Sequence, residues 1–80
     1  MKLPRDLSGY DLIKGLKKFG YTITRKTGSH IRLSTSINGE HHITVPAHDF
    51  LRIGTLASIL TAVAGHFNIS KEEVLTKIAK

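Results

Sequence analysis

One short segment of the chain places residues suited to proton transfer and anion binding at alternate positions. His30, Arg32 and Ser34 are spaced two residues apart, so an extended strand would carry all three side chains on one face. An imidazole has an unperturbed pKa of about 6.5 and exchanges protons near neutral pH, while a guanidinium binds phosphate oxygens. This combination suits chemistry on a phosphodiester.

Alternating apolar and polar residues predict three strands, at Tyr21–Lys26, His30–Ser34 and His41–Val45. The Asn38-Gly39 dipeptide predicts a tight turn before the third strand. We expect an antiparallel sheet with one apolar, buried face that includes Tyr21 and Ile23. The polar face would carry His30, His42, Arg32 and Lys26.

Helical periodicity predicts three helices around these strands. The first runs over Gly9–Phe19 after an N-cap at Ser8. The second begins with Thr55 as N-cap and ends at Gly65, and a short third helix follows Ser70. Both long helices must cover the apolar sheet face, so we predict an α+β two-layer sandwich in the order α-β-β-β-α plus a C-terminal helix. The polar face of the sheet would stay open.

Composition limits the class of protein. Eighty residues form one domain over 1–80, and the absence of cysteine excludes disulfides, thiolate catalysis and the usual zinc sites. No apolar run is long enough to cross a bilayer, so we expect a cytoplasmic protein without a membrane partner. The net charge of +6 favours a polyanionic partner, with nucleic acid first.

The basic residues are concentrated in the first two thirds of the chain. Residues 1–52 hold nine lysines and arginines against four acidic residues. Lys14, Lys17 and Lys18 lie away from the apolar stripe of the first helix and are candidates to bind nucleic acid. A simple solvated helix face explains these three lysines equally well.

The remaining histidines do not suggest a metal site. His41 and His42 are adjacent, so a strand would point them to opposite faces, and no carboxylate is spaced to complete a site. We therefore expect no metal and no cofactor. His42 is a candidate to assist His30 or a plain surface residue, His48 is expected to pack where the second helix begins, and His66 is expected on the surface.

The aromatic residues do not interleave with the basic ones, as they do in many proteins that stack nucleobases. Phe19, Phe50 and Phe67 are therefore expected in the core.

Four fragments in a fixed order resemble the HicA (YcfA-like) toxin family, small ribonucleases of bacterial and archaeal toxin–antitoxin pairs. They are an opening with a basic helix over Leu3–Tyr21, then Gly28-Ser29-His30, Val45-Pro46-Ala47-His48 and Gly54-Thr55-Leu56-Ala57-Ser58-Ile59-Leu60. The resemblance spans nearly the whole chain. It implies a fold similar to a double-stranded RNA-binding domain.

The resemblance also implies an activity and a partner. The activity is metal-independent cleavage of mRNA, with His30 of the Gly-Ser-His motif as general acid or base. The partner is a HicB-type antitoxin, which the charge of this chain predicts to be acidic and to cover the His30 face. Together with the basic face, these considerations give the expected RNA-binding residues as Lys14, Lys17, Lys18, Lys26, Ser29, Arg32 and His42.

Two other functions fit the same residues. A non-catalytic RNA-binding module would use the basic face and would have no need of His30. A degenerate toxin kept as a protein-binding partner would explain why the segment Leu56–Gly65 contains no lysine or arginine but has alanine at positions 57, 62 and 64.

Overall fold

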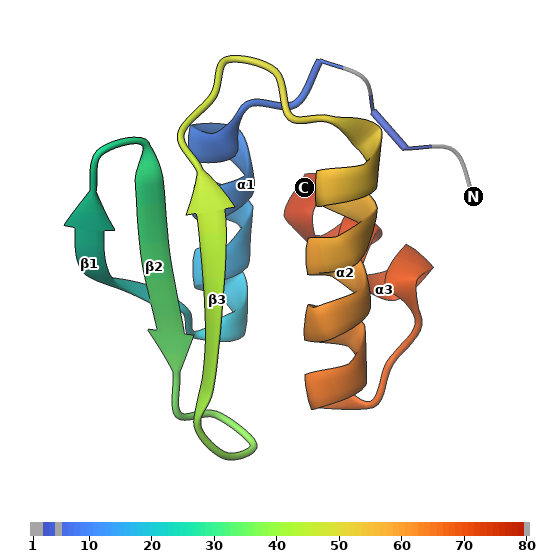
Figure 1. Cartoon of the computed structure of the whole chain (residues 1–80). Coiled ribbons are helices and arrows are strands. Elements are labelled where there is room, and N and C mark those ends of the chain that lie inside the picture. The colour runs from blue at the N-terminus through green and yellow to red at the C-terminus, as the bar shows by residue number, and fades with distance from the viewer. Residues whose placement is uncertain (1–2, 5, 80) are drawn as a thin grey trace.

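A computed structural model describes residues 3–4 and 6–79 of the chain (Figure 1). The elements follow the predicted α+β order, which is that of a double-stranded RNA-binding domain followed by one more helix. They are α1 (Gly9–Leu16) with a 3-10 turn η1 (Lys17–Phe19), β1 (Thr22–Thr27), β2 (His30–Thr35), β3 (His41–Pro46), α2 (Ile53–Phe67) and α3 (Lys71–Ala79).

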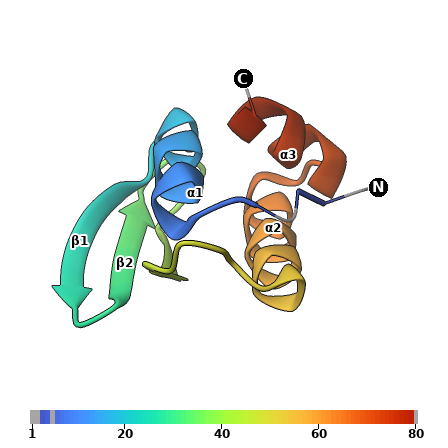
Figure 2. The same cartoon turned by 90° about the horizontal axis from the view of Figure 1, so that it is seen from above.

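The three strands form an antiparallel sheet in the order β1-β2-β3, with all helices on one side of it (Figure 2). Helices α1 and α2 both contact β3, and α3 contacts α1 and α2. The predicted arrangement is confirmed: helices cover one face of the sheet, and no described element covers the other.

The core lies between the sheet and the helices. In β2, Ile31 and Leu33 are buried and alternate with exposed His30 and Arg32. Thr35, the buried polar residue of this strand, donates its hydroxyl to the carbonyl oxygen of Phe19 at 3.2 Å. The largest fully buried side chains come from both layers and are Tyr21, Leu12, Leu16, Ile31, Leu33, Leu56, Leu60, Val45, Val63 and Val74.

Strand β1 departs from simple alternation because it contains a β-bulge. Ile23 pairs with Leu33, but the next pair is Arg25 with Arg32, so Thr24 is an extra residue on this strand. Ile23 faces the helix side, yet its side chain is 48% exposed. The prediction that Ile23 would be buried is therefore wrong, because β1 is the edge strand that extends beyond the helices, whereas β3 at the other edge is covered by them.

Helix α1 begins as predicted. The Ser8 hydroxyl accepts the backbone N–H of Asp11 at 3.0 Å, and Asp11 caps the backbone N–H of Ser8 in return. The start of the helix is fixed to the end of β3. Gly9 donates its N–H to the carbonyl of His48 at 2.9 Å, and a Cβ atom at Gly9 would overlap the carbonyl oxygen of Pro46.

Helix α2 is longer than predicted at both ends. It begins at Ile53 after an extended Arg52, so Thr55 lies inside the helix and is not its N-cap. The helix also continues past Gly65 to Phe67, where Asn68 adopts a left-handed conformation with φ 55°. The additional turn places the ring of Phe67 against that of Phe19, at 5.3 Å between centroids. Asparagine tolerates this conformation and ends the helix in place of glycine.

Helix α3 begins as predicted, with a capping box between Ser70 and Glu73, and it buries Val74 and Ile78. In the described ranges 3–4 and 6–79, no individual helix has the length and apolar character to cross a membrane. Helices α2 and α3 reach that length and composition only as a pair bent by 106°.

Candidate active site on the open sheet face

Strand pairing sorts the side chains of the open face into three rows, since directly paired residues project from the same side of a sheet. The rows are Thr27–His30–Pro46, Arg25–Arg32–Thr44 and Thr22–Ser34–His42. Each row lies two residues along β2 from the next, which corresponds to about 7 Å. A single face therefore presents an imidazole, then a pair of guanidiniums, then a row of hydroxyls with a second imidazole.

The two histidines of this face are too far apart to act on one phosphate. His42 pairs with Ser34, which lies four residues after His30 on β2. At about 3.3 Å per residue this separation is roughly 13 Å. His42 shares the face with His30 as expected, but it does not lie beside His30 as an assisting group.

His30 is the first residue of β2 and follows directly on the β1–β2 turn. Gly28 makes this turn with φ 55°, a conformation that glycine adopts without strain. The carbonyl of Ser29 accepts the N–H of Ala47 at 2.6 Å, which fixes the end of β3 beside the turn. The His30 imidazole is exposed and makes no hydrogen bond to any residue of the described chain, so its nitrogens are available to a ligand.

Arg25 and Arg32 lie opposite each other on β1 and β2, and both side chains are exposed. Neither forms an ion pair within the described part of the chain. Like charges directly across a strand pair are destabilising, so an anion between them would relieve the repulsion. Arg32 was predicted to be on this face, whereas Arg25 was missed.

Lys26 is on the other side of the sheet, and its predicted place on the open face is wrong. It pairs with Ile31, whose side chain is buried, and its Nζ lies 5.8 Å from the ring centroid of Tyr10 on α1. The bulge at Thr24 exchanges the faces of Arg25 and Lys26. Tyr21 and Ile23 set an alternation that requires an apolar residue at position 25. The sequence has Arg25 there, and this mismatch was the signal for the exchange.

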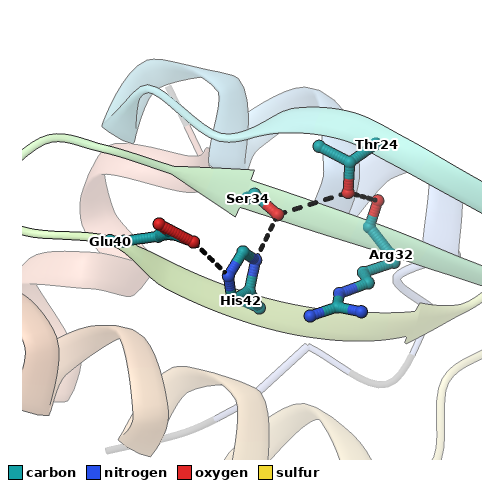
Figure 3. Close-up of polar contacts among 5 residues, drawn as sticks. All are labelled: Thr24, Arg32, Ser34, Glu40 and His42. Carbon is teal, nitrogen blue, oxygen red and sulfur yellow. Dashed lines mark hydrogen bonds and ion pairs between the residues drawn. The ribbon is translucent and has the colours of Figure 1, made fainter.

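A chain of hydrogen bonds links four side chains at the far end of the face (Figure 3). Nε2 of His42 lies 2.8 Å from a carboxylate oxygen of Glu40, and Nδ1 of His42 lies 2.5 Å from Oγ of Ser34. Ser34 Oγ is 3.2 Å from Oγ1 of Thr24, which also reaches the backbone carbonyl of Arg32 at 3.4 Å. The sequence placed His42 on this face but gave no indication of this network.

Lys14, Lys17 and Lys18 belong to the helix layer and are not brought together with His30. The Nζ of Lys18 donates to the carbonyl of Lys77 at 3.0 Å and so contributes to the contact between α1 and α3. The role of these three lysines in RNA binding stays a prediction, and it would involve a surface separate from the open sheet face.

The segment between β3 and α2 carries two side chains that were predicted to pack inside. Phe50 is 67% exposed and is therefore not a core residue, unlike Phe19. His48 is also exposed, and only its backbone carbonyl takes part in the packing, as acceptor for Gly9. The buried anchor of the segment is Leu51, whose N–H donates to the carbonyl of Leu7 at 2.9 Å.

His41 lies on the helix side of the sheet, opposite to His42. Its ring stacks on that of His66 at 4.5 Å between centroids, and its Nδ1 is 2.7 Å from the hydroxyl of Tyr21. Burial lowers the pKa of His41, and the nearby His66 and His42 lower it further. Burial raises the pKa of Tyr21 to about 12. His66 is therefore a structural residue and not the plain surface residue that the sequence suggested.

No three histidine, aspartate or glutamate side chains converge on a point where they could hold a metal ion, within the residues that the structure describes. On the open face, Glu40 and His42 are instead joined in the chain of hydrogen bonds that runs from Glu40 to Thr24.

A comparison with protein families matches residues 9–64 to the HicA toxin of bacterial toxin–antitoxin systems. The match covers the Gly28-Ser29-His30 turn, the whole sheet and most of α2, and it stops before α3. No curated protein and no solved structure matches the chain.

Proposed function

The chain belongs to the HicA toxin family of bacterial toxin–antitoxin systems, and from this membership we propose that it is an endoribonuclease that cleaves mRNA. His30 acts as the general acid or base. The observation that carries this proposal is the exposed imidazole of His30, which lies without a hydrogen-bond partner among the described residues at the end of an open, basic sheet face.

The proposed chemistry needs three contributions. A base removes the proton of the ribose 2′-hydroxyl, positive charge stabilises the crowded phosphorus, and an acid protonates the leaving 5′ oxygen. An imidazole exchanges protons near neutral pH, and guanidiniums stabilise developing negative charge on phosphate oxygens. His30 supplies one of the two proton transfers, as base or as acid, and water takes up or delivers the other proton. The Arg25–Arg32 pair in the next row supplies the positive charge.

Recognition of RNA is proposed to depend on charge and on the backbone. Arg25, Arg32 and the turn residue Ser29 would contact phosphates, which gives an affinity that falls steeply as salt is raised. This function would be exercised in the cytoplasm, where mRNA is found.

The test is cleavage of a defined mRNA by purified wild type and His30→Ala. We expect His30→Ala to abolish cleavage and to keep its affinity for RNA. His48→Ala, which removes another exposed imidazole, is the matched control and should cleave at the wild-type rate. Cleavage by His30→Ala at the wild-type rate would overturn the proposal, as would an equal loss in both variants.

Proton transfer by an imidazole requires no metal, so cleavage should persist in excess EDTA. Loss of cleavage on chelation, with recovery on adding a divalent ion, would contradict the mechanism proposed for His30.

A non-catalytic RNA-binding module is the second candidate. The Arg25–Arg32 pair favours it, because two guanidiniums can hold phosphate without any contribution from His30. This protein would bind RNA with the same salt dependence but would leave the RNA intact in the wild type.

The family is defined by toxin–antitoxin systems, and an antitoxin is therefore the expected protein partner. We propose a HicB-type antitoxin that is acidic and covers the face with His30 and Arg32. The net charge of +6, concentrated in residues 1–52, supports an acidic partner.

A further inference from the structure

The network of Thr24, Ser34, His42 and Glu40 lines a hollow at the end of the open face remote from His30. The hollow has a volume of about 460 Å³ and lies between the third row and the turn before β3. Its described lining includes no lysine or arginine, and consists of Gly20, Thr22, Thr24, Ser34, Thr35, Ser36, Glu40 and His42.

This lining selects the chemistry of the ligand. Hydroxyls, one imidazole and one carboxylate form hydrogen bonds with neutral polar groups, whereas the carboxylate of Glu40 would repel a phosphate. A sugar hydroxyl or the polar edge of a base fits such a surface. The phosphate of the same nucleotide has a separate place at the Arg25–Arg32 pair, one row away at about 7 Å.

The proton positions in the network favour a group that both donates and accepts. A carboxylate only accepts, so Nε2 of His42 donates its proton to Glu40. With the ring proton on Nε2, Nδ1 of His42 is an acceptor, so Ser34 donates its proton to His42 and is left as an acceptor toward Thr24. A ribose 2′-hydroxyl is both donor and acceptor and can join this network, and it is also the group that distinguishes RNA from DNA.

We propose that this hollow is a nucleoside subsite in which Ser34, His42 and Glu40 recognise the 2′-hydroxyl of a nucleotide beside the phosphate held by Arg25 and Arg32. The inference rests on the proposed action on RNA. It adds which group of the substrate the protein recognises, namely a ribose 2′-hydroxyl. Discrimination between RNA and DNA in binding then comes from the third row, and not from His30 or from the basic groups.

The test uses the His30→Ala protein, in which binding is measured without cleavage. Its affinities are compared for an RNA oligonucleotide, the DNA of the same sequence and the 2′-O-methyl RNA. We expect RNA to bind more tightly than either analogue. Adding Ser34→Ala should weaken RNA binding about five- to tenfold and leave DNA binding unchanged, a loss in the range of one hydrogen bond. Glu40→Gln also removes a charge that repels phosphate, so its readout is the ratio of RNA to DNA affinity, which should fall by a similar factor.

Thr44→Ala is the matched control, because it removes a hydroxyl from the same face beside Arg32 but outside the hollow. It should leave the ratio of RNA to DNA affinity unchanged. Equal loss of RNA and DNA affinity in Ser34→Ala, or an unchanged ratio in both hollow variants, would overturn the subsite.

Failure of the proposed function has a different signature. If the wild type leaves RNA intact but Ser34→Ala still removes the preference for RNA over DNA, the proposed endoribonuclease activity is contradicted and the subsite is supported. If the wild type cleaves RNA and the hollow variants keep this preference, the subsite is contradicted and the endoribonuclease activity is supported.

Discussion

Arg25 faces Arg32 across β1 and β2, with no acidic side chain of the described chain paired to either. The pairing exists only because Thr24 is inserted as a bulge, which turns Arg25 to the open face and Lys26 to the helix side. Two neighbouring residues of equal charge thus lie on opposite sides of one strand. They form a natural pair of test and control.

We expect Arg25→Gln in the His30→Ala protein to weaken RNA binding about tenfold, since it removes a charged hydrogen bond to phosphate. The slope of log affinity against log salt should become shallower by about 0.7, the value for one phosphate contact on a single strand. Lys26→Gln removes the same charge from the other side and should change both quantities little. Equal effects of the two substitutions, measured by RNA titration at several salt concentrations, would contradict a phosphate site between the arginines.

His30→Ala should leave the free energy of unfolding within about 0.5 kcal/mol of the wild type, because the imidazole is exposed and has no hydrogen bond in the described chain. Leu33→Ala, at a fully buried position three residues further along the same strand, should cost about 2–5 kcal/mol. Urea unfolding measures both. A large loss in His30→Ala would mean that absent cleavage reports misfolding and not chemistry.

Arg32→Glu should weaken both RNA and antitoxin binding, because both partners are proposed to use the same face. Charge pairs at such interfaces couple by about 1.5 kcal/mol or more, which corresponds to at least about a tenfold change in affinity. Lys71→Glu reverses a charge at the exposed start of α3 and is the control. If Lys71→Glu weakens antitoxin binding and Arg32→Glu does not, the antitoxin covers the helices and leaves the site open.

The protein should lose stability as the pH falls from 7.5 to 5. Burial and the neighbouring His66 and His42 lower the pKa of His41 in the fold, so the unfolded chain binds more protons below a pH of about 6.5. Tyr21, which also faces His41, stays neutral over this range because its pKa is about 12. His41→Gln should keep a polar partner for Tyr21 and make the urea midpoint less dependent on pH. Parallel profiles for the two proteins would contradict this assignment.

Periodicity predicted the layers and the open face, because those follow from which positions are apolar. It could not predict features that depend on one inserted residue or on the end of an element. The bulge at Thr24 breaks the alternation on which the faces of Arg25 and Lys26 were assigned. Phe50 was expected inside by its residue type, but Leu51 provides the buried contact and leaves the phenyl ring outside.

The candidate site was predictable in part. His30 and Arg32 follow from the spacing on one strand, and the Gly28-Ser29-His30 motif indicated the family. The link from Glu40 to His42 depends on how the turn at Asn38-Gly39 folds back, and the link to Ser34 depends on the register between β2 and β3. Neither is encoded by spacing along the chain, so the hollow had no sequence signal.

The tight fit of Gly9 against Pro46 has a genetic consequence. Pro46 is the cross-strand neighbour of His30, and any side chain at position 9 would displace the end of β3. In a culture forced to survive expression of the toxin, spontaneous escape alleles should therefore include changes at codon 9 as well as at codon 30. The two kinds of allele would differ in their protein products. The protein altered at position 30 should still fold and bind the antitoxin in the cell, whereas the protein altered at position 9 should be degraded by proteases.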